Sequence, residues 1–176
     1  MKKPIIIVLR GNSGSGKSTV AKMLQEKFGR GTLLISQDDV RIEMLCIRGG
    51  ADSKSIKLLY HLAQFGSNNC DVTILEGIMP ASEHEELFEQ INMLFEGRVF
   101  AYYFDLPFDE TLKRHEQKQQ AKLHNFGETE MKKWWRDKDF SAKINESIIT
   151  KDMSLNDIVK RIFNDVQKFG VKNLDN

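Results

Sequence analysis

Residues 5–19 read IIIVLRGNSGSGKST, and this stretch carries the strongest signal for the fold. Its first five residues, Ile5–Leu9, form an unbroken and largely β-branched apolar run, which is typical of a strand covered on both faces in a parallel sheet. Residues 11–18 then match the pattern G-x-x-x-x-G-K-[ST], and a segment of helical period begins at Lys17. A strand, a glycine-rich loop and a helix in this order predict a loop whose backbone amides enclose phosphate groups.

Each residue type in this loop suits the binding of phosphate groups and Mg²⁺. The glycines let the backbone curl so that successive N–H groups point inward, and the following helix adds its positive end. Lys17 is expected to reach the β- and γ-phosphates of ATP, Ser18 to offer its hydroxyl to Mg²⁺, and Thr19 to contact the α-phosphate. The predicted nucleotide-binding residues are Gly11, Asn12, Ser13, Gly14, Ser15, Gly16, Lys17, Ser18 and Thr19.

Apolar runs and helical patterns alternate along the rest of the chain. Strands are predicted at 32–35, 72–75, 98–104 and 147–150, and helices at 17–28, 39–47, 53–64, 82–95, 109–120, 128–135 and 154–169. Two helix starts carry capping signals, a capping box at Ser82 with Glu85 and Ser154 followed by Asp157. The alternation predicts one doubly wound α/β domain over residues 1–176. We expect a five-stranded, mainly parallel sheet ordered 2-3-1-4-5.

Composition excludes several classes of protein. The 176 residues hold 26 Lys and Arg against 25 Asp and Glu, so the net charge of +1 lacks the excess that drives nonspecific binding to duplex nucleic acid or anionic membranes. The two cysteines are too few for a disulfide framework, which favours a reducing compartment. No apolar run approaches the roughly 20 residues of a membrane span, and the run at 5–9 is too short for a signal peptide. A cytoplasmic protein without a membrane partner is expected.

Acidic residues follow the second predicted strand, in the stretch Ser36–Arg41. In a parallel sheet the ligand crevice lies at the carboxyl ends of the strands. Asp38 is therefore expected to accept the proton of an acceptor hydroxyl and to help hold Mg²⁺. The alternative is that Asp38 caps the next helix, as Asp39 is expected to do. Arg41 is expected to clamp the acceptor or a phosphate, with a solvated side chain as its alternative.

The third predicted strand ends in Glu76-Gly77. An acid at the end of a buried strand is placed to organise Mg²⁺ through water or to bind the acceptor. A surface acid at a strand end is the alternative for Glu76, but Gly77 directly after it indicates a close approach of backbone to ligand. Residues 77–80 are predicted to form a substrate loop.

Residues 111–138 are locally basic, with eight Lys and Arg against four acids. This segment is predicted to form a helical lid that closes over the nucleotide, excludes water and brings cations to the transferred phosphoryl group. Arg114 is the first candidate for that contact and Lys118 the second. A solvated basic helix is the alternative interpretation.

A phosphate loop alone does not separate kinases from GTPases, motors or switches. The chain has no N-K-x-D string of the kind that a GTPase uses to read its base, and it is short for a motor ATPase. Brevity therefore favours a small kinase.

Four stretches together resemble the phosphate-loop kinases of the zeta-toxin and AAA-like group: residues 11–18, SQDDVR at 36–41, ILEG at 74–77 and YFDLPFDETLKRH at 103–115. The layout is similar to the kinase half of phage-type polynucleotide 5′-kinase and to chloramphenicol phosphotransferase. This resemblance implies that Asp38 is the base and Arg114 the first lid arginine. Where polynucleotide kinases carry a second lid arginine, this chain has Lys118.

The expected function is transfer of the γ-phosphoryl group of ATP, with Mg²⁺, to a hydroxyl group of a small molecule such as a nucleoside, sugar or antibiotic. Two alternatives stay open: a polynucleotide 5′-hydroxyl kinase, and a nucleotide-binding switch or ATPase that phosphorylates nothing. The expected catalytic residues are Lys17, Asp38, Arg41 and Arg114; the substrate residues are Asp38, Arg41, Glu76 and Gly77; the metal-binding residues are Ser18, Asp38 and Glu76.

Overall fold

The structure, a computed structural model, describes residues 3–47, 52–119 and 127–169. Its five strands form one sheet in the order β2-β3-β1-β4-β5, and each neighbouring pair runs parallel. The strands are β1 (Ile5–Gly11), β2 (Leu33–Ser36), β3 (Val72–Gly77), β4 (Val99–Phe104) and β5 (Glu146–Ile149). The predicted α/β fold and strand order are confirmed, and the sheet is parallel throughout rather than mainly so.

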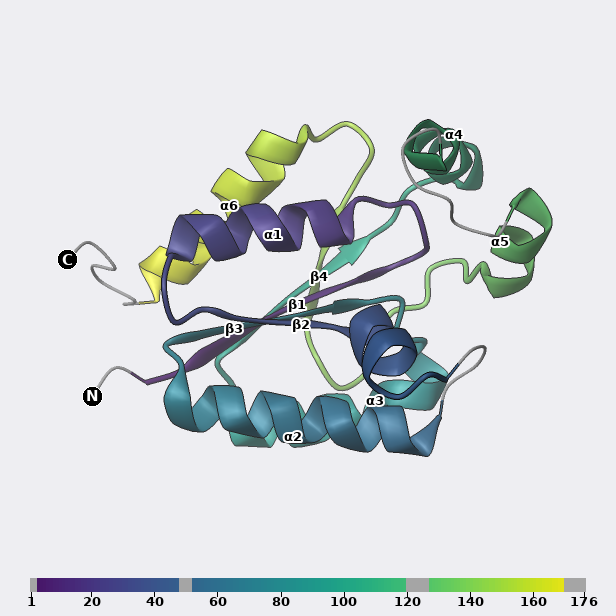
Figure 1. Cartoon of the computed structure of the whole chain (residues 1–176). Coiled ribbons are helices and arrows are strands. Elements are labelled where there is room, and N and C mark those ends of the chain that lie inside the picture. The colour runs from purple at the N-terminus through teal and green to yellow at the C-terminus, as the bar shows by residue number, and fades with distance from the viewer. Residues whose placement is uncertain (1–2, 48–51, 120–126, 170–176) are drawn as a thin grey trace.

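Helices cover both faces of this sheet (Figure 1). On one face lie α1 (Lys17–Phe28) and α6 (Leu155–Lys168), and on the other lie α2 (Ser53–Asn69) and α3 (Ala81–Leu94). Two further helices, α4 (Phe108–Gln119) and α5 (Glu128–Trp134), extend past the carboxyl ends of the strands. No helix in the described ranges combines the length and the apolar character needed to cross a membrane. Between β2 and α2 the chain forms a short π-helical turn, η1 (Asp39–Met44).

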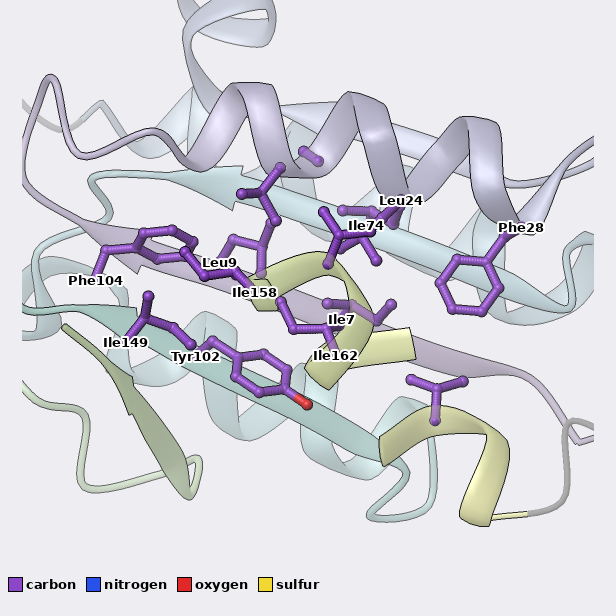
Figure 2. Packing of buried hydrophobic residues seen from close by; sticks show 14 of the residues in the cluster. Ile7, Leu9, Leu24, Phe28, Ile74, Tyr102, Phe104, Ile149, Ile158 and Ile162 are labelled. Atoms are coloured by element: carbon purple, nitrogen blue, oxygen red, sulfur yellow. The ribbon is translucent and has the colours of Figure 1, made fainter. Parts of the chain in front are cut away.

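The central strand β1 is buried on both faces, as its unbroken apolar run predicts. Ile5, Ile7 and Leu9 pack with α1 and α6, in the cluster that Figure 2 shows from close by. Ile6 and Val8 point the other way, into a second cluster with α2 and α3. Full burial of one aliphatic side chain stabilises a fold by roughly 1.5–3 kcal/mol, so β1 is held firmly up to the point where the phosphate loop begins.

The two predicted helix caps have different outcomes. Ser154 caps α6 as expected, because its hydroxyl oxygen accepts a hydrogen bond from the Asp157 N–H at 3.2 Å. The capping box at Ser82 is wrong: α3 begins one residue earlier, at Ala81, after Pro80. The Ala81 N–H donates instead to the Asp139 carboxylate at 2.9 Å. An acceptor supplied from a distant part of the chain replaces the local one.

Candidate active site

The loop between β1 and α1 is shaped by glycines, and the first turn of α4 packs directly against it. Gly14 has φ +76°, a conformation that residues with a Cβ rarely adopt. A Cβ there would lie 2.5 Å from the Thr111 carbonyl oxygen. The absence of a side chain at Gly14 therefore allows both the turn of the loop and the close packing of α4, the helix that begins the predicted lid.

Lys17 lies within the curl of this loop. Its side chain is 6% exposed, and its ammonium donates to the Asn12 carbonyl at 2.8 Å and to the Ser15 hydroxyl at 3.2 Å. A cation held inside a ring of backbone groups is placed to meet phosphate oxygens. The predicted role of Lys17 at the β- and γ-phosphates stays a prediction, and this placement is compatible with it.

Glu76 ends β3 next to the phosphate loop and is 6% exposed, so its interpretation as a surface acid is wrong. Its carboxylate accepts a hydrogen bond from the Ser18 hydroxyl at 3.1 Å. Burial raises the pKa of Glu76, while Lys17 and the hydroxyls of Ser18 and Ser36 oppose the rise. Glu76 pairs in register with Ser36 at the end of β2, so Asp38, two residues later, lies at the same edge of the sheet, and its carboxylate also raises the pKa of Glu76.

The hydroxyl of Ser18 and the carboxylate of Glu76 are oxygen donors, the type that Mg²⁺ prefers. Among the residues that the structure describes, no group of three or more His, Cys, Asp or Glu side chains could hold a metal ion. An ion at Ser18 and Glu76 would thus complete its shell with phosphate and water oxygens, which is the usual way that Mg²⁺ binds at nucleotide sites. The donor set fits the predicted ion on these terms.

Asp38 and Arg41 lie at the start of η1, which follows β2. Asp38 is the residue before the turn, but its side chain makes no capping hydrogen bond; the Asp39 N–H donates to the Ser36 hydroxyl instead, at 3.3 Å. The expectation that Asp39 is the cap is therefore wrong. The Asp38 carboxylate, 64% exposed, accepts a hydrogen bond from Arg41 at 3.1 Å. An exposed ion pair of this kind contributes little to stability, so its members are available to bind a ligand.

Arg114 lies on α4, facing the phosphate loop. Its guanidinium pairs with Glu110 one turn earlier, at 2.7 Å, and donates to the Ser15 carbonyl at 3.3 Å. The first lid candidate is thus in contact with the loop, although its role in transfer stays a prediction. The second candidate, Lys118, has a side chain outside the described part of the structure. The predicted lid also includes residues 120–126, which lie outside the described ranges.

A cleft of about 600 Å³ opens beside the phosphate loop. Such a volume lies in the range of small-ligand sites. Sequence reasoning did not select residues 151–155, because they match no motif; the Ser154 cap marked this segment only as a helix start. The lining residues are Gly14, Gly16, Thr19, Arg114, Lys151, Asp152, Met153, Ser154 and Leu155.

Arg10, which sequence reasoning also missed, is fully buried at the end of β1. It donates to both carboxylate oxygens of Glu146 at 2.9 Å and to a carboxylate oxygen of Asp139 at 3.0 Å. It also donates twice to the Met79 carbonyl, and its guanidinium lies 4.9 Å from the ring centre of Phe88. A charged residue directly after an apolar strand was the available signal, but its partners lie up to 136 residues away.

Asn12 links the phosphate loop to the segment that follows α5. Its side-chain amide donates to the Arg136 carbonyl at 2.6 Å and accepts from the Arg136 N–H at 2.9 Å. Three residues after Arg136, the Asp139 N–H donates to the hydroxyl of Tyr103 on β4 at 3.2 Å. The chain after the predicted lid is therefore attached to the loop and to the sheet.

Comparisons with known proteins agree with this architecture. The sequence profile of the zeta toxin family matches residues 1–48. The bifunctional enzyme NodQ of Rhizobium sp. (strain N33) is 25% identical over 119 residues, which are 64% of this chain and 18% of NodQ, so the chain spans less than a fifth of that relative.

Two similar solved structures extend the likeness to nearly the whole chain. A gluconokinase from Sinorhizobium meliloti 1021 has a TM-score of 0.64 at 15% identity, covering 96% of this chain and 95% of its own. The Mycobacterium tuberculosis APS kinase CysC, in complex with AMPPNP and APS, has a TM-score of 0.64 at 19% identity, covering 96% and 99%. The predicted likeness is confirmed at the level of architecture: this chain has the fold of the P-loop kinases.

Proposed function

We propose that this chain transfers the γ-phosphoryl group of ATP to a hydroxyl group of a small molecule. The observation that carries the proposal is the gathering of opposite charges at one edge of the sheet. Ser18, the neighbour of Lys17 in the phosphate loop, donates to the buried Glu76 at the end of β3 at 3.1 Å. Ser36, two residues before Asp38, is the β2 partner of Glu76 in the sheet. A phosphate-binding cation and an exposed carboxylate on the same edge are the two parts that phosphoryl transfer to a hydroxyl requires.

The nucleotide would lie along the phosphate loop, with its nucleoside in the cleft beside residues 151–155. In this arrangement the loop amides and Lys17 hold the phosphates, and Arg114 closes the cleft from α4. Bound Mg²⁺, held by Ser18 and organised by Glu76, would neutralise charge on the β- and γ-phosphate oxygens. The APS kinase with this fold was solved with AMPPNP and APS, which supports a nucleotide and an acceptor together on such a scaffold.

Asp38 would act as the general base. The acceptor oxygen forms a bond to the γ-phosphorus as the bond from that phosphorus to the β–γ bridging oxygen breaks, and the hydroxyl proton passes to the Asp38 carboxylate. The products are ADP and a phosphorylated alcohol. Arg41, paired with Asp38 at 3.1 Å, would orient this carboxylate. When the acceptor binds, Arg41 would release Asp38 and bind the acceptor instead. Arg114 would stabilise the charge that develops on the transferred group.

The test is a screen of the purified chain with ATP, Mg²⁺ and a panel of nucleosides, sugars, hydroxyl-bearing antibiotics and a 5′-hydroxyl oligonucleotide. Mass spectrometry is expected to find one small molecule that gains a phosphoryl group. Asp38→Asn is expected to lower kcat about 10²- to 10⁴-fold with the affinity for ATP unchanged, because only general-base catalysis is removed.

Three results would contradict the proposal. Labelling of the oligonucleotide alone would identify a polynucleotide kinase. ATP hydrolysis that no member of a broad panel stimulates, with no phosphorylated product, would identify a switch or an ATPase. Transfer by Asp38→Asn at the wild-type rate would show that this carboxylate is not the base.

A further inference from the structure

The loop of residues 77–80, the predicted substrate loop, is attached to the segment that follows β2 through the side chain of Gln37. Gln37, the residue directly before Asp38, accepts a hydrogen bond from the Met79 N–H at 3.2 Å. A Cβ at Gly77 would lie 2.5 Å from the side-chain oxygen Oε1 of Gln37 and 2.6 Å from the Gln37 Cβ, so the loop backbone packs against this side chain. Gln37 thus connects the substrate loop to the chain that carries the proposed base.

The opposite end of the Gln37 amide faces His84 on α3. The two atoms are Gln37 Nε2 and His84 Nε2, 3.3 Å apart, and the other ring nitrogen, Nδ1, lies 3.0 Å from the Pro80 carbonyl oxygen. His84 is 1% exposed, and its ring stacks on Phe88 with centroids 6.2 Å apart. The ring therefore has one fixed orientation between Gln37 and the loop.

Hydrogen-bond chemistry assigns every proton in this chain of contacts. The Met79 N–H can only donate, so it requires the carbonyl end of Gln37, and the NH₂ end must then face the ring. Nε2 of His84 must therefore accept, which leaves the ring proton on Nδ1. From there it is donated to the Pro80 carbonyl, which can only accept. The Met79 N–H and the Pro80 carbonyl, at the two ends of this series of hydrogen bonds, thus require the neutral ring with its proton on Nδ1.

We propose that His84 is a positioning residue for the acceptor side of the site: its neutral ring, protonated on Nδ1, orients Gln37, and Gln37 holds the loop of residues 77–80 beside Asp38. The inference rests on the proposed function, because that function makes this loop the acceptor side. His84 touches no reacting atom. It acts through the side-chain amide of Gln37 and through its own hydrogen bond to the Pro80 carbonyl of the loop.

The surroundings of His84 favour the neutral ring. Burial lowers the pKa of His84 from its usual 6.5, and Arg10 on β1 lowers it further; the Pro80 carbonyl, Glu83 on α3 and Asp139 before β5 oppose the shift. At neutral pH the ring is therefore uncharged. Protonation in acid would put a proton on Nε2, opposite the NH₂ group of Gln37. Two donors would then face each other, and Gln37 would have to turn and release the Met79 N–H.

The first test reads the tautomer and needs no substrate. Long-range ¹H–¹⁵N spectra of the full chain at neutral pH are expected to show His84 with its proton on Nδ1. The Met79 amide signal is expected to titrate in acid with the same midpoint as the ring, and to lose this titration in His84→Gln, whose amide oxygen can accept from Gln37 without changing charge. An Nε2-protonated ring, or a Met79 signal that titrates equally in His84→Gln, would overturn the inference.

The second test reads the acceptor side by kinetics at neutral pH. Asn reaches only the Nδ1 position of the ring and Gln reaches the Nε2 position, so His84→Asn leaves the Gln37 NH₂ group without an acceptor while His84→Gln supplies one. His84→Asn is expected to lower kcat/KM for the acceptor about tenfold or more, the cost of one unpaired buried polar group. The KM for ATP should not change, and His84→Gln should restore most of the loss.

His61→Gln, at an exposed position of α2, is the matched control and should leave both kinetic constants unchanged. Equal losses in His84→Asn and His84→Gln, or a loss shared by ATP and the acceptor, would show a merely structural histidine. If no acceptor is phosphorylated at all, the proposed function fails, while the spectra still decide the assignment of His84.

Discussion

Replacement of Arg10 by Met should destabilise the fold far more than the loss of an ordinary surface charge. Arg10 is fully buried and pairs with Glu146, whose side chain is 3% exposed, and with Asp139 at 20%. Burial already raises the pKa of Glu146, and Arg10 is the main group that opposes the rise. Removal of one partner from a buried ion pair leaves the other charge uncompensated and typically costs about 3–5 kcal/mol.

Urea denaturation measures this cost. With a slope of about 2 kcal/mol per M, a loss of about 4 kcal/mol moves the midpoint down by about 2 M. Arg98→Met is the matched control, since Arg98 pairs with Glu96, an acid that is 64% exposed, and should change the free energy of unfolding by about 1 kcal/mol or less. Glu146→Leu added to Arg10→Met should recover part of the loss, because it removes the uncompensated charge.

The reasoning would be refuted by an Arg10→Met midpoint no lower than that of Arg98→Met. It would also be refuted if the second substitution, Glu146→Leu, made the Arg10→Met variant still less stable. Either result would mean that the buried guanidinium does not compensate the acids around it.

Three further substitutions test the site by stability and exchange. Gly14→Ala should lower the free energy of unfolding by clearly more than Gly97→Ala in urea titrations, because both have φ +76° but only Gly14 has a backbone oxygen 2.5 Å from the added Cβ; equal losses would contradict the packing of α4 on the loop. Glu76→Gln should raise the melting temperature at neutral pH. Burial raises the pKa of Glu76 in the folded protein, so the wild type loses stability as pH rises from 4.5 through that folded pKa. The stability gained by Glu76→Gln should therefore vanish in acid, and a variant less stable than the wild type at pH 7 would contradict the burial argument. Asn12→Ala should speed hydrogen exchange of the Arg136 amide about tenfold or more, since both hydrogen bonds between the two residues are lost, whereas unchanged exchange would show that Asn12 does not hold this segment.

Local sequence patterns predicted most of the fold. The phosphate loop was read from spacing, and the alternation of strands and helices predicted a parallel sheet with helices on both faces, because parallel strands need crossovers of fixed hand. α1 was predicted at its observed bounds, and β1 was predicted from residue 5 although it continues to Gly11. These features depend on periodic burial and on backbone conformation over a few residues. The information that sets them is therefore contiguous in the chain.

The candidate site was predicted only where it follows such patterns. Ser18 and Glu76 come into contact because a motif places the first and a strand end the second, while their roles stay predictions. The helix cap at Asp39 was wrong because a serine hydroxyl three residues earlier accepts the hydrogen bond of its N–H group. Several polar groups near a helix start can accept the same backbone N–H. Which of them does so depends on local geometry, and residue preferences alone do not predict that geometry.

Neighbouring residues specify the strand, the glycine-rich loop and the helix that follows it, so these elements and the layered sheet around them could be predicted from local patterns. Contacts between distant groups could not: Arg10 meets Asp139 and Glu146, and Gln37 meets His84, only in the folded chain. Such pairs are separated by 47 to 136 residues in the chain. They form because the sheet brings strand ends together and excludes water there, so that each buried polar group must find its partner within the protein.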